Sequence, residues 1–145
     1  MILRLLILVS AAFLLPAQAC AQEPDIVVQG DAARAEIERV LNADNLDTTR
    51  LSARDVVDII TGIPRGRAPE DFWNAYQLHV RAWSRLADAV ERAQSAQGES
   101  TLGEGMEEVE AAEGAIETTF DEVERIATRY GARLPPPPVD TNSIA

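Results

Sequence analysis

One stretch of 28 residues, 69–96, constrains the fold of this chain more than any other. It holds both tryptophans, Trp73 and Trp83, together with Tyr76 and the single histidine, His79. At about 100° per residue, these side chains share one arc with the apolar residues of the stretch, while most of its charged residues fall on the opposite side. The pattern predicts a long amphipathic helix that buries its aromatic face.

A second amphipathic segment predicts a partner helix of similar length. Thr101 and Glu104 have the spacing of a capping box, and Gly131 suits a helix C-terminus, so this helix is expected from about Thr101 to Tyr130. Its expected apolar face consists of Met106, Val109, Ala112, Ile116, Phe120, Val123, Ala127 and Tyr130. Only about four residues separate it from the aromatic helix, and so short a connection favours an antiparallel hairpin.

Two shorter helices are expected before the hairpin. Asp31 can cap the first, and the turn-forming stretch 42–49 should end it. Ser52 and Asp55 have capping-box spacing and predict the second, which Gly62 should end. The sequence therefore predicts an all-α fold, a small helical bundle built on a long antiparallel helix hairpin, with two short N-terminal helices and extended termini.

The chain divides into four expected parts. Residues 1–21 combine Arg4, a short apolar run and small residues, as a secretory signal peptide does, and the run is too short for a permanent membrane anchor. Residues 22–30 are expected to form an extended leader, because a proline precedes a β-branched run. Residues 31–131 are expected to form the helical domain, and residues 132–145 a Pro-rich disordered tail.

Cys20 is the only cysteine, so no intramolecular disulfide can form. Residues 17–20, Ala-Gln-Ala-Cys, resemble the lipobox of bacterial lipoproteins, and this resemblance implies lipid attachment at Cys20. The alternative is ordinary cleavage after Ala21, which the small residues at 19 and 21 fit. Both alternatives predict export into a Gram-negative envelope, as a free periplasmic protein or as one anchored to the membrane through Cys20.

The charge of the chain disfavours polyanionic partners. The formal net charge is −11, and removal of Arg4 with the signal would make it −12. Nucleic acid and anionic lipid would be repelled, so no nucleic-acid partner is expected, and membrane contact is expected only through lipid on Cys20. Residues 99–124 contain ten acidic residues and no basic one, which predicts a solvated helix face.

The sequence lacks the common catalytic motifs. It has no nucleophile elbow, phosphate-binding glycine loop, Cys-x-x-Cys or His-Glu-x-x-His, so we expect no cofactor and no metal site. The leading hypothesis is a non-enzymatic exported protein that acts as a periplasmic protein-interaction module. The alternative is a small-ligand-binding protein or weak enzyme with a groove around Trp73, Tyr76, His79 and Trp83. A packed core position is the default expectation for His79, and a general base or pH switch is the alternative.

Overall fold

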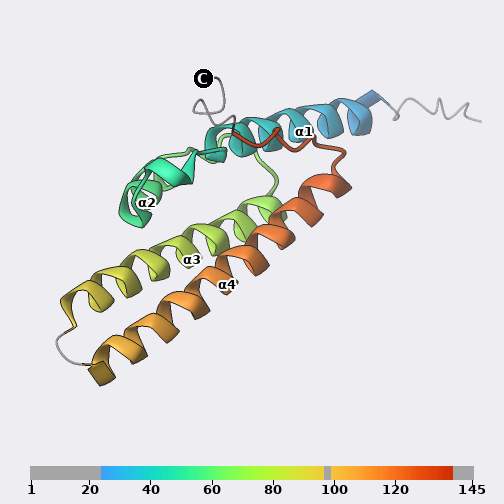
Figure 1. Cartoon of the computed structure of the whole chain (residues 1–145). Coiled ribbons are helices and arrows are strands. Elements are labelled where there is room, and N and C mark those ends of the chain that lie inside the picture. Colours follow the sequence, from blue (N-terminus) through green and yellow to red (C-terminus); the bar gives the residue numbers. More distant parts are fainter. Residues whose placement is uncertain (1–23, 97–98, 139–145) are drawn as a thin grey trace, which may run out of the picture.

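The structure, a computed structural model, describes residues 24–96 and 99–138 of the 145-residue chain, with side chains from Gly30 onward except at 99–101. These residues form four α-helices and one short 3-10 helix, with no β-strand among them. In chain order the elements are α1 (Pro24–Asp44), η1 (Thr48–Arg50), α2 (Ala53–Thr61), α3 (Glu70–Ser95) and α4 (Glu99–Arg129) (Figure 1). The predicted all-α fold is confirmed.

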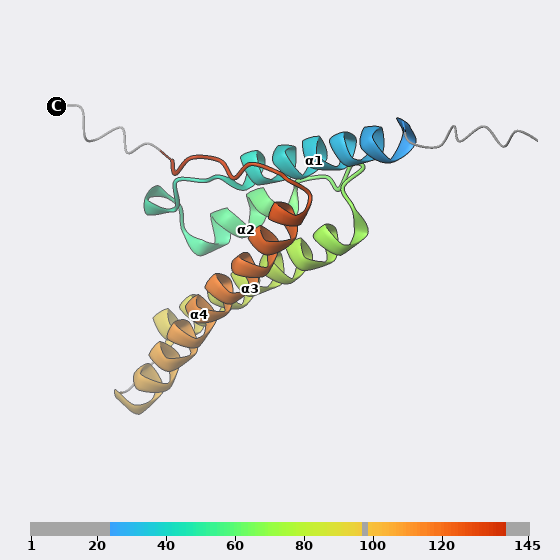
Figure 2. The same ribbon diagram turned by 90° about the vertical axis from the view of Figure 1, so that its right-hand side faces the viewer.

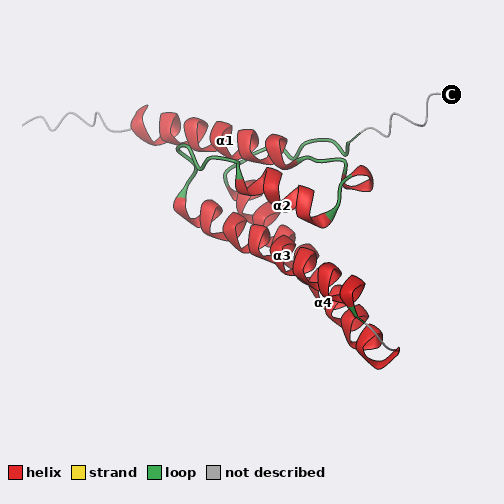
Figure 3. Ribbon diagram, turned by 90° about the vertical axis from the view of Figure 1, so that its left-hand side faces the viewer, coloured by secondary structure: helices red, strands yellow, loops and turns green. Residues whose placement is uncertain are grey.

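The two long helices, α3 and α4, form the predicted antiparallel hairpin and lie side by side (Figures 1 and 3). Their backbones approach closely near the connection between them. A Cβ built on Gly105 of α4 would lie 3.1 Å from both the Cα and the Cβ of Ala93 on α3. Glycine at position 105 therefore allows a contact that a larger side chain would push apart.

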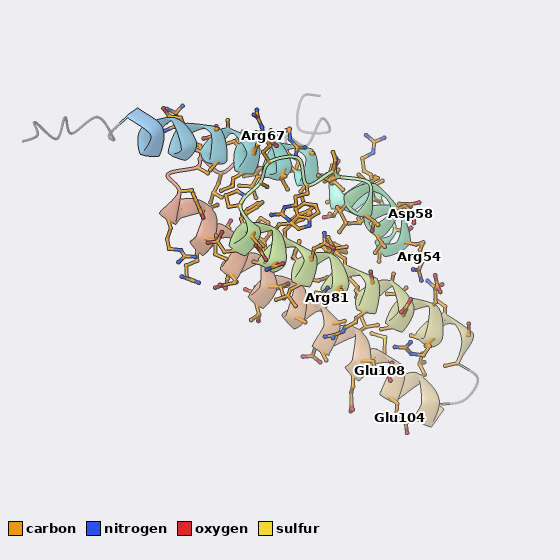
Figure 4. The ribbon with its side chains drawn as sticks, turned by 180° about the vertical axis from the view of Figure 1, so that it is seen from behind. Arg54, Asp58, Arg67, Arg81, Glu104 and Glu108 are labelled. Carbon is orange, nitrogen blue, oxygen red and sulfur yellow. The ribbon has the colours of Figure 1, made fainter. Side chains whose placement is uncertain are left out.

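The two N-terminal helices cover one end of the hairpin, where α3 begins and α4 ends. In Figure 2, α1 crosses above this end, and α2 lies between α1 and α3. Arg54 on α2 donates to Asp88 and Glu91 on α3, at 2.8 and 3.0 Å, and so links the start of α2 to α3 (Figure 4). The other end of the hairpin projects beyond α1 (Figure 2).

The main core cluster lies where the helices meet at the covered end. Phe72 and Tyr76 of α3 are fully buried, with their rings stacked at 6.3 Å between centroids. Around them pack buried residues of the other helices and of the loop before α3: Ile37, Val40, Leu41, Val56, Ile60, Ile63, Ala68, Val123, Ile126 and Ala127. Each large side chain buried there stabilises the fold by roughly 1.5–3 kcal/mol, so this end is the principal source of stability.

Two helix termini match their sequence signals. The Ser52 hydroxyl accepts from the Asp55 N–H at 3.2 Å, and the Asp55 carboxylate accepts from the Ser52 N–H at 3.0 Å, which confirms the capping box of α2. After α4, Gly131 has a φ of 69° and donates its N–H to the carbonyl of Thr128, while the next residue donates to the carbonyl of Ala127. This pair of bonds is a Schellman motif.

The start of the helical region differs from the sequence expectation. Helix α1 begins at Pro24 and has 21 residues, so the expected extended leader is wrong for residues 24–30, and the first helix is not short. Proline suits the first turn of a helix, because the N–H that it lacks would have no partner there. The β-branched run after it lowers helix propensity only weakly. The expected signal, residues 1–21, lies outside the described residues.

The start of α4 also differs. It begins at Glu99, so the spacing of Thr101 and Glu104 does not mark its first turn. Met106, expected on the apolar face, is 57% exposed, and Gly105 is buried against α3 in its place. Farther along α4 the predicted face is confirmed by its buried members, Ala112, Val123 and Ala127.

The segment after α4, residues 132–138, runs along α1 without regular secondary structure (Figure 1). The Arg133 N–H donates to the Glu38 carboxylate at 3.0 Å, and the Asn45 amide donates to the Pro136 carbonyl at 2.9 Å. The expected disordered tail is therefore wrong for these residues. Residues 139–145 lie outside the described part.

Candidate ligand pocket

A cavity of about 260 Å³ opens where all four helices and the segment after α4 meet. We call it the junction pocket. Its principal lining residues are Leu41 and Asp44 of α1, His79 and Trp83 of α3, Phe120 of α4, and Pro135. Pro135 forms part of the wall because the adjacent Pro136 is hydrogen-bonded to Asn45. Segments far apart in the sequence therefore build the pocket together.

His79 is held in one neutral tautomer by the partners of its two ring nitrogens. The Thr119 hydroxyl donates to the Ala115 carbonyl at 2.7 Å, so it accepts from His79 Nδ1 at 3.2 Å. The Trp83 indole can only donate, and its Nε1 lies 3.1 Å from His79 Nε2, so Nε2 carries the lone pair. Burial lowers the pKa of His79 from 6.5 to about 4, and the ring is neutral at pH 7.

Asp44, the last residue of α1, brings a buried charge to the pocket. Its side chain is 8% exposed, and Oδ1 accepts from the Tyr76 hydroxyl at 3.3 Å. Oδ2 lies 3.9 Å from His79 Nε2, too far for a hydrogen bond, and that nitrogen has no hydrogen to give. Burial raises the pKa of Asp44 from 3.8 to about 6, so the carboxylate is mostly ionised at pH 7.

The second oxygen of Asp44 has no donor in the described part of the protein. Among the described residues, none donates a hydrogen bond to Oδ2. No fully buried side-chain oxygen or nitrogen in the described part lacks a partner, so Oδ2 must have access to open space. Asp44 lines the junction pocket, and a bound molecule could donate to this oxygen.

The structure brings together two of the four predicted groove residues. His79 and Trp83 line the junction pocket. Tyr76 is fully buried and reaches the pocket only through its bond to Asp44, and Trp73 packs on Tyr76 with 5.4 Å between ring centroids, outside the lining. The predicted buried position of His79 is confirmed at 4% exposure, and a binding role for these residues stays a prediction.

Sequence reasoning missed Asp44 and Thr119 as parts of the site. Asp44 fell in a stretch expected to be a turn and is one of 24 acidic residues. One signal was available: Ile37, Leu41 and Asp44 follow helical spacing, so extending the first helix would have placed Asp44 on its apolar face. Helical spacing likewise places Thr119 on the apolar face of α4. Glu117, which was expected on a solvated face, lines the pocket.

The other predicted sites stay untested. No group of three or more metal-ligating side chains occurs among the described residues. Cys20, the lipidation candidate, lies outside them. Within the described part, no helix has both the length and the apolar character that crossing a bilayer requires. Comparisons of the chain with protein-family models, curated proteins and solved structures gave no match.

Proposed function

We propose that this protein is an exported binding protein whose junction pocket holds a small, mostly apolar ligand. The observation that supports this most directly is a cavity of about 260 Å³ into which a nearly buried, half-satisfied carboxylate opens. Apolar walls that surround a few convergent polar groups are the usual composition of small-molecule sites. Here Trp83, Phe120 and Leu41 supply the walls, and Asp44 supplies a polar anchor.

The volume of the pocket limits the size of the ligand. An engineered apolar cavity of about 150 Å³ binds benzene, so the junction pocket suits a molecule of roughly ten non-hydrogen atoms. For ligands of this size the free energy of binding lies between about 0.3 and 1.5 kcal/mol per atom. Weak binding is therefore expected for probes that fit only part of the pocket, and they should be tested up to millimolar concentrations.

Trp83 provides a direct readout of binding. The Trp73→Phe variant leaves Trp83 as the only tryptophan, and benzyl alcohol is a neutral probe of suitable size. We expect a saturable change in Trp83 emission on titration. Adding Ile116→Phe, which fills the pocket from α4, should abolish the change, and adding Val109→Phe, a half-buried α4 position outside the lining, should leave it intact. The proposal fails if neither benzyl alcohol nor its charged analogues give a saturable response.

A second candidate is the predicted role as a protein-interaction module. It is favoured by two large apolar residues one turn apart near the start of α4, Leu102 at 48% and Met106 at 57% exposure. A photo-reactive residue at 106 should form a discrete adduct with a partner in the native host, and one at Glu113 on the same helix should not. Equal labelling from both positions would count against a docking surface there.

Export and anchoring are part of the proposal and need their own test. The intact mass of protein purified from its host should match a chain starting at Gln22 if a signal peptide is removed after Ala21. A chain starting at Cys20 with added lipid mass would instead establish an envelope lipoprotein. A mass that retains residues 1–21 would refute export by signal cleavage.

A further inference from the structure

The charged groups that face the junction pocket are acidic. Asp44 lies at the end of α1, and Glu117 lines the pocket from α4. Val56 of α2 and Pro135 of the segment after α4 bring no charge, and His79 of α3 is neutral at pH 7. No arginine of the described residues is in the lining. An anionic ligand would therefore meet only repulsion, whereas a cation would be attracted.

The second oxygen of Asp44 receives no hydrogen bond from the described residues. Tyr76 already occupies Oδ1, and Nε2 of His79 is committed as the acceptor of the Trp83 indole. Because Oδ2 has access to open space, it can be hydrated in the unliganded state, and a ligand donor would replace that water. A ligand N–H⁺ group would satisfy Oδ2 with a charge-assisted hydrogen bond, which is stronger than a neutral one.

Two aromatic rings line the same pocket as Asp44. Trp83 and Phe120 line the same pocket, with their rings 6.4 and 5.1 Å from the His79 ring between centroids. Aromatic faces attract cations, and their apolar area also holds a hydrocarbon body. We propose that the junction pocket selects a small organic cation, an ammonium group that binds Asp44 Oδ2 and an apolar body that packs against Trp83 and Phe120. The inference rests on the ligand-binding function proposed above and specifies the charge of the ligand.

Three probes with the same ring and different charge test this selection. Benzylamine is a cation at neutral pH, benzyl alcohol is neutral, and benzoate is an anion. Titrated at pH 7 into the Trp73→Phe protein, benzylamine should bind roughly 10- to 100-fold more tightly than benzyl alcohol, the range expected for one hydrogen bond to a charged group. Benzoate should bind more weakly than benzyl alcohol.

A variant pair assigns the effect to Asp44. Asp44→Asn should reduce benzylamine affinity to that of benzyl alcohol and leave the affinity for benzyl alcohol within about twofold. Asp58→Asn removes the same charge from an exposed position on α2 outside the lining (Figure 4) and should preserve the preference for benzylamine. Circular dichroism of each variant establishes that it is folded.

The pH dependence of benzylamine binding to protein that retains Asp44 gives a test that does not require Asp44→Asn to fold. Asp44 is faced by Tyr76 and His79 of α3 and by Glu117 of α4, and it becomes protonated as pH falls below about 6. Benzylamine affinity should therefore drop by up to about 10-fold between pH 7 and pH 5, while benzyl alcohol affinity stays nearly constant. Equal affinities for the two probes, or tighter binding of benzoate, would overturn the cation preference and leave ligand binding standing. A lack of binding by all three probes would overturn both proposals.

Discussion

Asp44 and His79 should make opposite contributions to the pH dependence of stability, and removing either one should expose the other. Burial raises the pKa of Asp44 from 3.8 to about 6 and lowers the pKa of His79 from 6.5 to about 4. Between pH 4 and pH 6, the folded state holds the Asp44 proton more tightly than the unfolded state does. It holds the His79 proton less tightly. The two residues therefore act against each other over nearly the same pH range.

The sign of each effect follows from proton binding. For Asp44 the folded state binds more protons between pH 3.8 and about 6, so the free energy of unfolding falls as pH rises through this range. For His79 the unfolded state binds more protons between about 4 and 6.5, so the free energy of unfolding rises with pH. At about 1.4 kcal/mol per pKa unit, each contribution is about 3 kcal/mol. In the unsubstituted protein the two nearly cancel.

Two substitutions separate these contributions. Relative to the unsubstituted protein, Asp44→Asn should gain about 3 kcal/mol of stability as pH is raised from 4 to 7. His79→Gln, which can still accept from Trp83, should instead gain about 3 kcal/mol as pH is lowered over the same range. The comparison uses differences from the unsubstituted protein, so the titration of the other carboxylates is common to both and drops out.

Urea unfolding followed by far-UV circular dichroism between pH 4 and pH 7 measures these differences. The surface variant Asp58→Asn serves as control, and its difference should stay within about 0.5 kcal/mol over the range. Differences of the same sign for Asp44→Asn and His79→Gln would refute the reasoning, and so would differences that do not change with pH. Differences that do not change with pH would mean that the two side chains are hydrated in the folded state, and differences of the same sign would mean that one of the two pKa shifts has the opposite direction.

Further predictions concern stability at positions away from the pocket. A methyl group at Gly114 meets open space, so Gly114→Ala should stabilise the protein by up to about 1 kcal/mol. A methyl group at Gly105 would lie 3.1 Å from the backbone of α3, so Gly105→Ala should give no such stabilisation or should destabilise the protein. Urea titrations of the two variants measure the difference. Ser52→Ala removes a capping oxygen and should cost about 1 kcal/mol by the same assay. Phe72→Ala should reduce stability by about 3–5 kcal/mol because the ring is fully buried. Leu78 is 49% exposed, so Leu78→Ala should change stability by no more than about 0.5 kcal/mol. Equal losses of stability in thermal melts of the two variants would contradict the assigned burial.

Local signals predicted much of the backbone. The period of apolar residues identified both long helices, and the short connection between them predicted the hairpin. Ser52 and Gly131 marked helix ends correctly, because caps and left-handed glycines act through bonds within a few residues. Local signals failed at Pro24 and Thr101, where a proline and a capping pattern were compatible with more than one helix start.

The sequence by itself determined that this chain is helical, that α3 and α4 pair, and that His79 is buried, because each follows from spacing along one or two helices. The tertiary structure alone decided the junction pocket. Asp44 meets Tyr76 across 32 positions of the chain, and Pro135 comes from beyond α4 to complete the wall. Periodicity tells which face of a helix is buried, but not which residue of another helix it will meet. The position of Asp44, with one oxygen to which no described residue donates, results from these contacts between helices and cannot be predicted from the sequence.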